Sequence, residues 1–564
     1  MRSTYFLLAL VAICLQFSCA DKHPKADLVL FNGNIYTLNE TEPKAEALAV
    51  TDGKIVYVGN NVNANQWVAD TTQIIDLEGK TLTPGFIEGH GHLMGIGENL
   101  INLNLLNTKS YDEIIEMVKT KVDEAEDGEW ILGRGWHQDK WFVLPENMID
   151  GFPSHNKLSE ISPNNPVVLS HASGHMVLAN EKAMELAGIN QDTPDPEGGT
   201  IFKDLGGNPT GILNETAELL LEGVIPEDSD ERRIQILNMA IEECLKNGIT
   251  SFHDAGTKQK TIDLYESFLN NGLLKIRLYV MLDGLDEGLL NNWYASGPRI
   301  GLGNNFLTIR AIKLYADGAL GSRGALLLED YEDAPGIQGL RLTPADYIMR
   351  VTEQGTKNGF QICTHCIGDR ANREVLDMYE IVLKSDSTQA NPRFRIEHAQ
   401  HIAADDIPRF GQLGVIPSMQ AIHMSSDRPW AIDRLGEKRI VESAYMWQEL
   451  ISTGANVMNG TDAPVEPVNP LASFYASVTR QTLKGKPDNG YEPDQRMNRK
   501  QALQAYTINN AYGAFEEDIK GTIEIGKVAD FTVLSKDIMK IDAKEILTTE
   551  VEYTIVNGEV LYQK

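Results

Sequence analysis

Apolar runs punctuated by turn residues predict β-strands at both ends of the chain. They occupy residues 26–38, 47–59 and 72–85 near the amino end, and 521–535 and 551–564 near the carboxyl end. Asn-Gly and Asp-Gly pairs inside them favour the tight turns of antiparallel strands. We therefore expect one composite β-sandwich, built from residues 26–84 and 520–564, that brings the two ends of the chain together.

Between these ends, strand-like runs alternate with helical stretches over residues 85–519. The runs are the segment that leads into His90 and residues 248–256, 274–282, 307–318, 359–369, 393–401, 413–420 and 455–464. Eight parallel strands alternating with helices close into a barrel. The predicted fold class is α/β, a (β/α)8 TIM-like barrel that carries the sandwich.

The stretch that follows the first barrel strand is too long for one strand-to-helix connection. Helical patterns cover residues 111–125 and 230–248. The second of these helices is expected to pack on the barrel, so the predicted insertion spans about 105–225. Long insertions at the carboxyl ends of barrel strands commonly build substrate pockets.

Charge narrows the choice of partners. The formal net charge is -30 and 42% of the residues are hydrophobic. A surface of this charge would repel nucleic acid and an anionic membrane. A small-molecule substrate is expected and no nucleic-acid partner. A homodimer is compatible with the sequence, but no motif demands one.

The first twenty residues have the pattern of an export signal. Arg2 is followed by an apolar stretch and by small residues at 18–20. Two interpretations stay open, a lipid anchor at Cys19 as in bacterial lipoproteins, or cleavage after Ala20. No later segment approaches the roughly 20 apolar residues of a membrane span. We predict an exported protein, either periplasmic or anchored to the membrane of a bacterium.

Three cysteines follow the signal segment, Cys244, Cys363 and Cys366. The odd count argues against a disulfide framework. The last two form a Cys-x-x-Cys pair, as some zinc and redox sites do, but no second pair accompanies it. We interpret them as small buried thiols at a strand end.

Polar residues end several of the predicted barrel strands. His90 and His92 are two residues apart, so in an extended strand both imidazoles lie on one face and can reach one metal ion. His365, His398 and Asp462 each end a further strand. Any one of them alone is as well explained as a core or loop residue. Together, at the edge where barrel enzymes keep their active sites, they predict a metal centre.

Lys313 lies inside the apolar run 307–318. Such a lysine must extend to solvent, pair with an acid or lose its charge. A neutral lysine amine can take up carbon dioxide as a carbamate, whose two oxygens can bridge two cations. The residues by themselves favour an ion-paired core lysine.

These motifs together resemble the amidohydrolase superfamily. The resemblance rests on "GFIEGHGH", the strand lysine, "THCIGDRAN", "IEHAQH" and "NGTDAP". More narrowly, the chain resembles the family 3 branch that includes N-substituted formamide deformylase and D-aminoacylase-like enzymes. The likeness covers nearly all of residues 26–564, including "RGWHQDKW". Such motifs are specific for the family and say little about the substrate.

The resemblance implies a centre of two divalent metal ions, with zinc as the default because imidazole suits it. The implied ligands are His90 and His92 for one ion and His365 and His398 for the other, with Lys313 as a bridging carbamate and Asp462 as a further ligand. Asp462 would also act as the general base and acid. The D-aminoacylase-like relatives carry cysteine at the lysine position and depend mainly on one metal, so Lys313 favours two.

Residues around this centre would contact the substrate. Trp136, His137 and His175 are expected to line the mouth of the site from the insertion. His423, after the seventh strand, would either hydrogen-bond the substrate as part of the catalytic machinery or be an ordinary loop histidine. Relatives often carry an acid two residues before His175, whereas Ser173 stands there in this chain.

Asp317 and Arg323, in the loop after the lysine strand, allow two interpretations. They would have a functional role, in fixing that loop or contacting the substrate, or they would form only a structural ion pair.

The expected activity is hydrolysis of non-peptide carbon–nitrogen bonds, such as those of N-acyl or N-formyl amines. One alternative is a deaminase of a ring amidine, which needs a glutamate to protonate a ring nitrogen. Glu397 precedes His398, but strand alternation would point it away from the site. The other alternative is an exported ligand-binding protein with a vestigial site. That alternative predicts a missing ligand residue, and none is missing.

Overall fold

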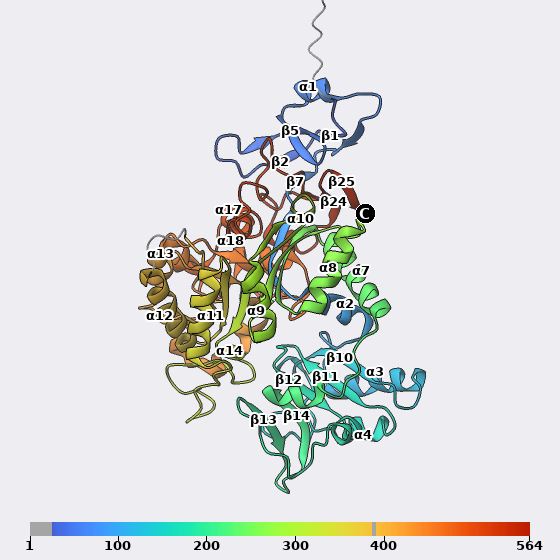
Figure 1. The fold of residues 1–564 in the computed structure, drawn as a ribbon, viewed down its shortest axis with the longest axis vertical. Coiled ribbons are helices and arrows are strands. Elements are labelled where there is room, and N and C mark those ends of the chain that lie inside the picture. The colour runs from blue at the N-terminus through green and yellow to red at the C-terminus, as the bar shows by residue number, and fades with distance from the viewer. Residues whose placement is uncertain (1–24, 386–390) are drawn as a thin grey trace, which may run out of the picture.

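The computed structural model describes residues 25–385 and 391–564. Figure 1 shows three parts in a row, with the sheets of the chain ends at one end, a barrel in the middle and the insertion at the other end. The predicted export signal and Cys19 lie outside the described residues. Within the described ranges, no helix has the length and apolar character needed to cross a membrane.

A nearly closed sheet of eight parallel strands forms the centre of the molecule. Its strands follow one another in the order β8, β15, β16, β18, β19, β20, β21 and β22, and β17 (Arg299–Gly301) pairs with β18 outside this order. Their bounds are β8 (Phe86–Gly91), β15 (Ile249–Thr257), β16 (Arg277–Asp283), β18 (Leu307–Tyr315), β19 (Gln361–Cys366), β20 (Arg395–His398), β21 (Ile416–Met419) and β22 (Met458–Asn459). Every run predicted to be a barrel strand is a strand of this sheet.

Backbone hydrogen bonds bring the first and last barrel strands together at their carboxyl ends. The Asp462 amide donates to the His90 carbonyl at 2.9 Å, and the His92 amide donates to the Ala463 carbonyl at 2.7 Å. Closure of the sheet therefore places the segment after β22 directly against the two histidines of β8.

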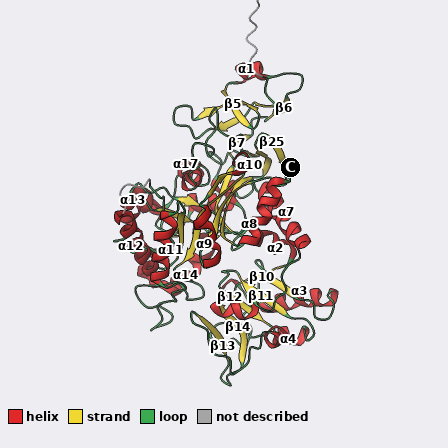
Figure 2. Cartoon of the chain, viewed as in Figure 1, coloured by secondary structure: helices red, strands yellow, loops and turns green. Residues whose placement is uncertain are grey.

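Helices cover the outside of the barrel sheet (Figure 2). They include α2 (Leu93–Ile101), α7 (Asp230–Lys246), α8 (Gln259–Asn270), α9 (Glu287–Ser296), α11 (Ala345–Lys357), α12 (Asp369–Ser385), α13 (Ile407–Leu413), α14 (Ala421–Glu442), α15 (Trp447–Ser452) and α16 (Pro470–Thr479). The prediction that residues 230–248 form a helix on the barrel is confirmed, because α7 packs closely on α2. A Cβ added at Gly97 of α2 would overlap the Ile236 carbonyl of α7.

Strands from both chain ends share one six-stranded sheet, in the order β25, β24, β23, β7, β2 and β3, next to a four-stranded sheet in the order β5, β4, β1 and β6. Their bounds are β1 (Leu28–Phe31), β2 (Asn34–Tyr36), β3 (Lys44–Ala45), β4 (Ala47–Thr51), β5 (Lys54–Gly59), β6 (Gln73–Asp76), β7 (Thr81–Pro84), β23 (Phe531–Leu534), β24 (Val551–Val556) and β25 (Glu559–Gln563). Leu30 and Leu48 of the smaller sheet share a hydrophobic cluster with Leu82 and Phe531 of the larger one. Because β7 continues into β8, the larger sheet is joined directly to the strand that carries His90.

The insertion contains a sheet that the sequence analysis did not anticipate. Its six strands run in the order β13, β14, β12, β11, β10 and β9. Their bounds are β9 (Leu103–Asn104), β10 (Ile131–Trp136), β11 (Val167–His171), β12 (Met176–Ala179), β13 (Gly199–Lys203) and β14 (Pro209–Glu215). Helix α3 (Tyr111–Glu124) confirms the helix predicted at residues 111–125, and α4 (Asn156–Ile161) and α5 (Glu181–Leu186) accompany it.

Cys244, Cys363 and Cys366 are buried free thiols. This confirms their interpretation as small core residues.

Candidate metal centre

Three side chains converge where the first and last barrel strands meet. The Nε2 atoms of His90 and His92 lie 3.6 and 3.3 Å from Asp462 Oδ1. All three ligand atoms lie within 4.8 Å of one another, close enough to bind one metal ion. His90 and Asp462 are buried, whereas the His92 side chain is 37% exposed.

The far ring nitrogen of each of these histidines faces an oxygen acceptor. His90 Nδ1 lies 2.6 Å from Glu397 Oε2, and His92 Nδ1 lies 3.1 Å from the Ala255 carbonyl oxygen. An acceptor at Nδ1 keeps the ring proton there, which leaves the Nε2 lone pair free for a metal. Burial, together with the nearby Lys313, lowers the pKa of His90 to about 4, so the ring is neutral, as a metal ligand must be.

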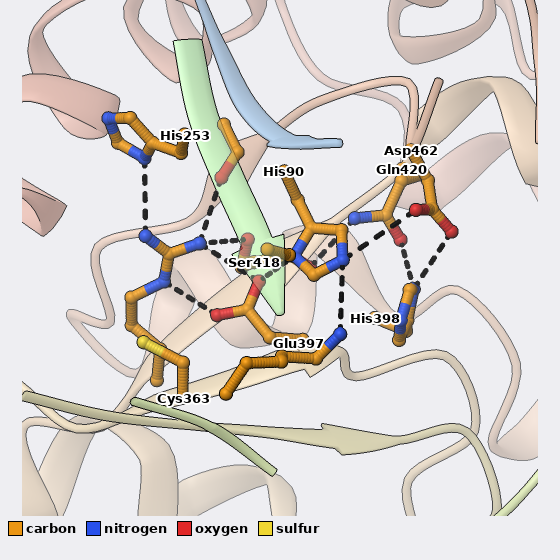
Figure 3. Close-up of polar contacts among 12 residues, drawn as sticks. His90, His253, Cys363, Glu397, His398, Ser418, Gln420 and Asp462 are labelled. Atoms are coloured by element: carbon orange, nitrogen blue, oxygen red, sulfur yellow. Dashed lines mark hydrogen bonds and ion pairs between the residues drawn. The ribbon is translucent and has the colours of Figure 1, made fainter. Parts of the chain in front are cut away.

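Glu397 lies inside the barrel behind His90, and the expectation that it points away from the site is wrong. Arg395 donates to its two carboxylate oxygens at 2.6 and 2.9 Å. Burial alone would raise the pKa of Glu397, but Arg395 and His90 hold it well below its ordinary value. Figure 3 shows this polar network passing from His253 through Glu397 to His90 and on toward Asp462 and His398.

The reason for the error lies in the backbone of His398. Arg395 and Glu397 alternate into the barrel as a regular strand requires. His398, however, has a φ of 71° and leaves the strand conformation. Neighbouring residues of a regular strand point to opposite faces. The turn at His398 removes this restriction, so Glu397 and His398 both reach the site.

A second group of possible ligands shares Asp462. His398, His423 and Asp462 offer ligand atoms within 4.8 Å of one another. His398 Nδ1 lies 2.8 Å from Gln420 Oε1 and 3.9 Å from Asp462 Oδ2, so one nitrogen of this ring faces both side chains. His423, for which the sequence left two interpretations open, thus lies beside a candidate ligand.

Lys313 and His365 stand next to these two groups. Lys313 Nζ lies 3.4 Å from His90 Nε2, and burial lowers the pKa of the lysine. His365 Nε2 lies 3.6 Å from Asp317 Oδ1, and the His365 ring centre is 4.4 Å from that of His398. The pairing of His365 with His398 on one ion stays a prediction.

The donor set fits a divalent metal. In the described part of the chain, the buried Nε2 atoms of His365 and His423 have no hydrogen-bond partner. A buried polar atom without a partner costs free energy, and a ligand that binds it removes that cost. Imidazole nitrogens with a carboxylate oxygen are donors that zinc accepts readily.

A cavity of about 540 Å³ opens onto this centre between the barrel and the insertion. His92, Lys313, His365, His398, His423 and Asp462 line it from the barrel, and His137 and His175 line it from the insertion. The structure thus places His137 and His175 at the mouth where the sequence analysis expected them.

Trp136 does not line this cavity. Its side chain is fully buried in the insertion, and its Nε1 donates to the Leu169 carbonyl at 2.7 Å. The pairing of β10 with β11 shifts register between Arg134 and Trp136, around Gly135, which has a φ of 110°. A bulge reverses the alternation of side chains, so Arg134 faces the cavity and Trp136 packs into the core.

His175 has a carboxylate partner that sequence reasoning missed. Its Nδ1 lies 2.8 Å from Oε2 of Glu215, whose side chain is buried. Burial alone would lower the pKa of His175, but Glu215 holds it above its ordinary value. A Cβ at Gly318 or Gly324 would overlap Glu215 Oε1, so these two glycines leave the room that the carboxylate occupies.

Asp317 and Arg323 neither line the cavity nor pair with each other. Asp317 accepts hydrogen bonds from the backbone amides of Leu326, Ile367 and Gly368, at 2.8, 3.0 and 2.8 Å. Arg323 instead pairs with Asp333 at 3.0 Å. Asp317 therefore fixes the loop after the lysine strand, and the structure gives neither residue a place against a substrate.

The sequence profile of the amidohydrolase family matches residues 73–562. The chain belongs to the amidohydrolase family. Putative amidohydrolase YtcJ of Bacillus subtilis is 31% identical over 94% of this chain and 98% of its own length. N-substituted formamide deformylase of Arthrobacter pascens is 27% identical over 95% of this chain and 98% of its own length.

A solved structure supports the assignment of this chain to the amidohydrolases. An uncharacterized metal-dependent hydrolase from Pyrococcus horikoshii has a TM-score of 0.74 and 29% sequence identity, and covers 92% of this chain and 99% of its own. The chain is thus a metal-dependent hydrolase of the amidohydrolase superfamily. The deaminase alternative is not favoured, and the buried Glu397 is engaged by Arg395 and His90.

Proposed function

We propose that this amidohydrolase cleaves non-peptide carbon–nitrogen bonds in N-acyl or N-formyl amines. The observation that carries the proposal is the convergence of His90, His92 and Asp462 at the cavity, with the far nitrogens of both imidazoles held. Support for an amide substrate comes from the relative named N-substituted formamide deformylase.

His90, His92 and Asp462 would hold the first divalent ion. Such an ion lowers the pKa of water from near 16 toward about 7 and polarises a carbonyl oxygen. Asp462 faces the cavity and also touches both histidines, so it is placed to accept the proton of the attacking water. The same carboxyl then passes that proton to the leaving nitrogen.

We propose a second ion, with zinc as the metal at both positions. His365 and His398 would hold it, and His423 and Asp462 offer further ligand atoms beside His398. Lys313 would act as a carbamate at this centre. The lowered pKa of the buried Lys313 supports this, because the neutral amine is the form that reacts with carbon dioxide.

His175 is proposed to donate a hydrogen bond to the substrate from the insertion. Glu215 is its positioning residue, since the carboxylate holds Nδ1 at 2.8 Å and fixes the ring orientation. A histidine held in this way presents its other nitrogen in a defined direction.

The test is amine release from N-formyl and N-acetyl benzylamine by the zinc-loaded enzyme. The wild type is expected to hydrolyse at least one of them and to lose activity when a chelator removes the metal. Asp462→Asn should lower kcat by about 1,000-fold or more, since it removes a ligand and the proton carrier. Asp192→Asn, at an exposed carboxylate of the insertion, should leave kcat unchanged. Full activity of the Asp462 variant would refute the mechanism.

A further inference from the structure

Arg134 belongs to the cavity wall that the insertion contributes. It lies on β10, directly before the bulge at Gly135 that turns Trp136 into the core. Without this bulge, the strand would present Trp136 to the cavity on the same face as Arg134. The backbone therefore presents a guanidinium, and not the indole of Trp136, to the cavity at this end of β10.

The Arg134 guanidinium has few partners in the protein. Its Nη2 donates to the Ala172 carbonyl at 3.3 Å. Its buried Nε has no hydrogen-bond partner among the described residues. A Cβ at Gly174 would come within 3.2 Å of Nη2, so the glycine keeps the space beside the guanidinium open.

Asp462, Glu218 and Glu98 act on Arg134 through their charges, but neither Asp462 nor Glu98 forms an ion pair with it. Lys140, another cation of the cavity wall, is in contrast paired with Glu466 at 3.7 Å. Glu98 also lines the cavity but forms no ion pair with Arg134. A partly desolvated charge costs free energy, which an anionic ligand can offset.

The surroundings of Arg134 agree with a role in binding an anion. Burial lowers its pKa, while the charges of Asp462, Glu218 and Glu98 oppose that shift, so the guanidinium is desolvated and faces the same cavity as the metal centre. An arginine fork offers two parallel N–H donors, the geometry that a carboxylate accepts.

We propose that Arg134 binds a carboxylate of the substrate, so that the preferred substrates are acylated amines whose amine part bears a carboxylate. This inference rests on the proposed function, because it assumes that an amide occupies the cavity. Arg134 acts by binding alone, and Asp462 keeps its role in proton transfer. The residue would make the insertion a determinant of substrate specificity.

The test compares N-formylphenylalanine with N-formylphenylalanine amide, two compounds that differ in one charge. The zinc-loaded wild type should prefer the acid. Arg134→Met should lower kcat/KM for the acid by roughly 100-fold and change the value for the amide by less than about threefold. Arg134→Lys, which keeps the charge without the fork, should fall in between. Lys157→Met removes the same charge from an exposed lysine of the insertion, which pairs with Asp112 at 2.6 Å outside the cavity, and should leave the preference unchanged.

Metal content and thermal unfolding of each variant show whether it is folded and loaded. An equal loss of kcat/KM for both compounds in Arg134→Met, or a wild type without preference for the acid, would refute carboxylate binding by Arg134. The hydrolase proposal would survive either result. If the wild type hydrolyses neither these compounds nor the benzylamine amides, the proposed function fails. Calorimetry with the same two compounds then tests carboxylate binding by Arg134 independently of turnover. Equal affinity of wild type and Arg134→Met for the acid would refute it, and a tenfold or greater weakening would support it.

Discussion

Arg395, Glu397 and His90 form a chain of buried charged and polar groups inside the barrel. The carboxylate accepts two hydrogen bonds from Arg395 and lies 2.6 Å from His90 Nδ1. Oxygen acceptors behind a metal-binding histidine orient the ring and raise its basicity. Glu397 therefore serves both the fold, by compensating Arg395, and the metal centre, by fixing His90.

Glu397→Gln is expected to weaken both functions. It leaves the buried Arg395 without its counter-charge, so we expect the free energy of unfolding to fall by about 3 kcal/mol. Zinc affinity should fall by roughly 10- to 100-fold, because His90 loses its charged acceptor. Denaturant unfolding and competition with a zinc chelator measure the two effects.

Glu492→Gln is the matched control. Glu492 pairs with the buried Arg480 at 3.0 Å, outside the metal centre. Its replacement should lower stability in the same way and leave zinc affinity unchanged. Wild-type zinc affinity in Glu397→Gln would show that the acceptor behind His90 does not matter.

Chemistry at the residue scale was predictable where a polar residue ends an apolar strand. His90, His92, His398 and Asp462 all stand at such ends, and the structure brings their ligand atoms together in two groups. Glu215 was not predictable, because it contacts His175 only through the pairing of the inserted strands.

Glycines decide how closely the elements pack. Helices α2 and α7 approach so closely at Gly97 that an added Cβ would overlap the Ile236 carbonyl. Because α2 begins directly after His92, the position of α7 against α2 also supports the segment that carries the two histidines.

Gly97→Ala should therefore destabilise the protein. Overpacking against backbone cannot be relieved by a rotamer change, so we expect a loss of roughly 2 kcal/mol in the free energy of unfolding. Gly288→Ala in α9 is the control, since its Cβ would meet only Asp286 Oδ1, at 3.3 Å. There alanine should be neutral or slightly stabilising. Thermal unfolding of both variants tests this prediction. Equal melting temperatures of Gly97→Ala and Gly288→Ala would contradict the close packing of α2 on α7.

Elements were predictable where their apolar runs are continuous. The barrel strands are continuous apolar runs because a parallel sheet is covered on its faces. The strands of the insertion were missed because polar residues and glycines interrupt their apolar runs, as glycine and asparagine do in β14. The bulge at Gly135 likewise arises from strand pairing. Because of it, Arg134 lines the cavity where Trp136 was expected.

At the scale of the molecule, the metal centre lies between two supports. On one side, the sheet shared by the chain ends continues through β7 into β8 and the two histidines. On the other, Lys140 of the insertion pairs with Glu466, and Asp139 pairs with Arg434 of α14, across the cavity. The insertion is thereby fixed over the centre, where it can select substrates. Export and a homodimer stay predictions.

The central claim is that His90, His92 and Asp462 hold a metal ion. The most direct measurement is anomalous diffraction across the zinc absorption edge, on crystals of protein purified without added metal. The account predicts a peak bounded by these three side chains, a second beside His398 and His423, and density for a carbamate on Lys313. A single peak at the first position would confirm the centre and refute the second ion. No peak at His90, His92 and Asp462 in zinc-soaked crystals would contradict the account.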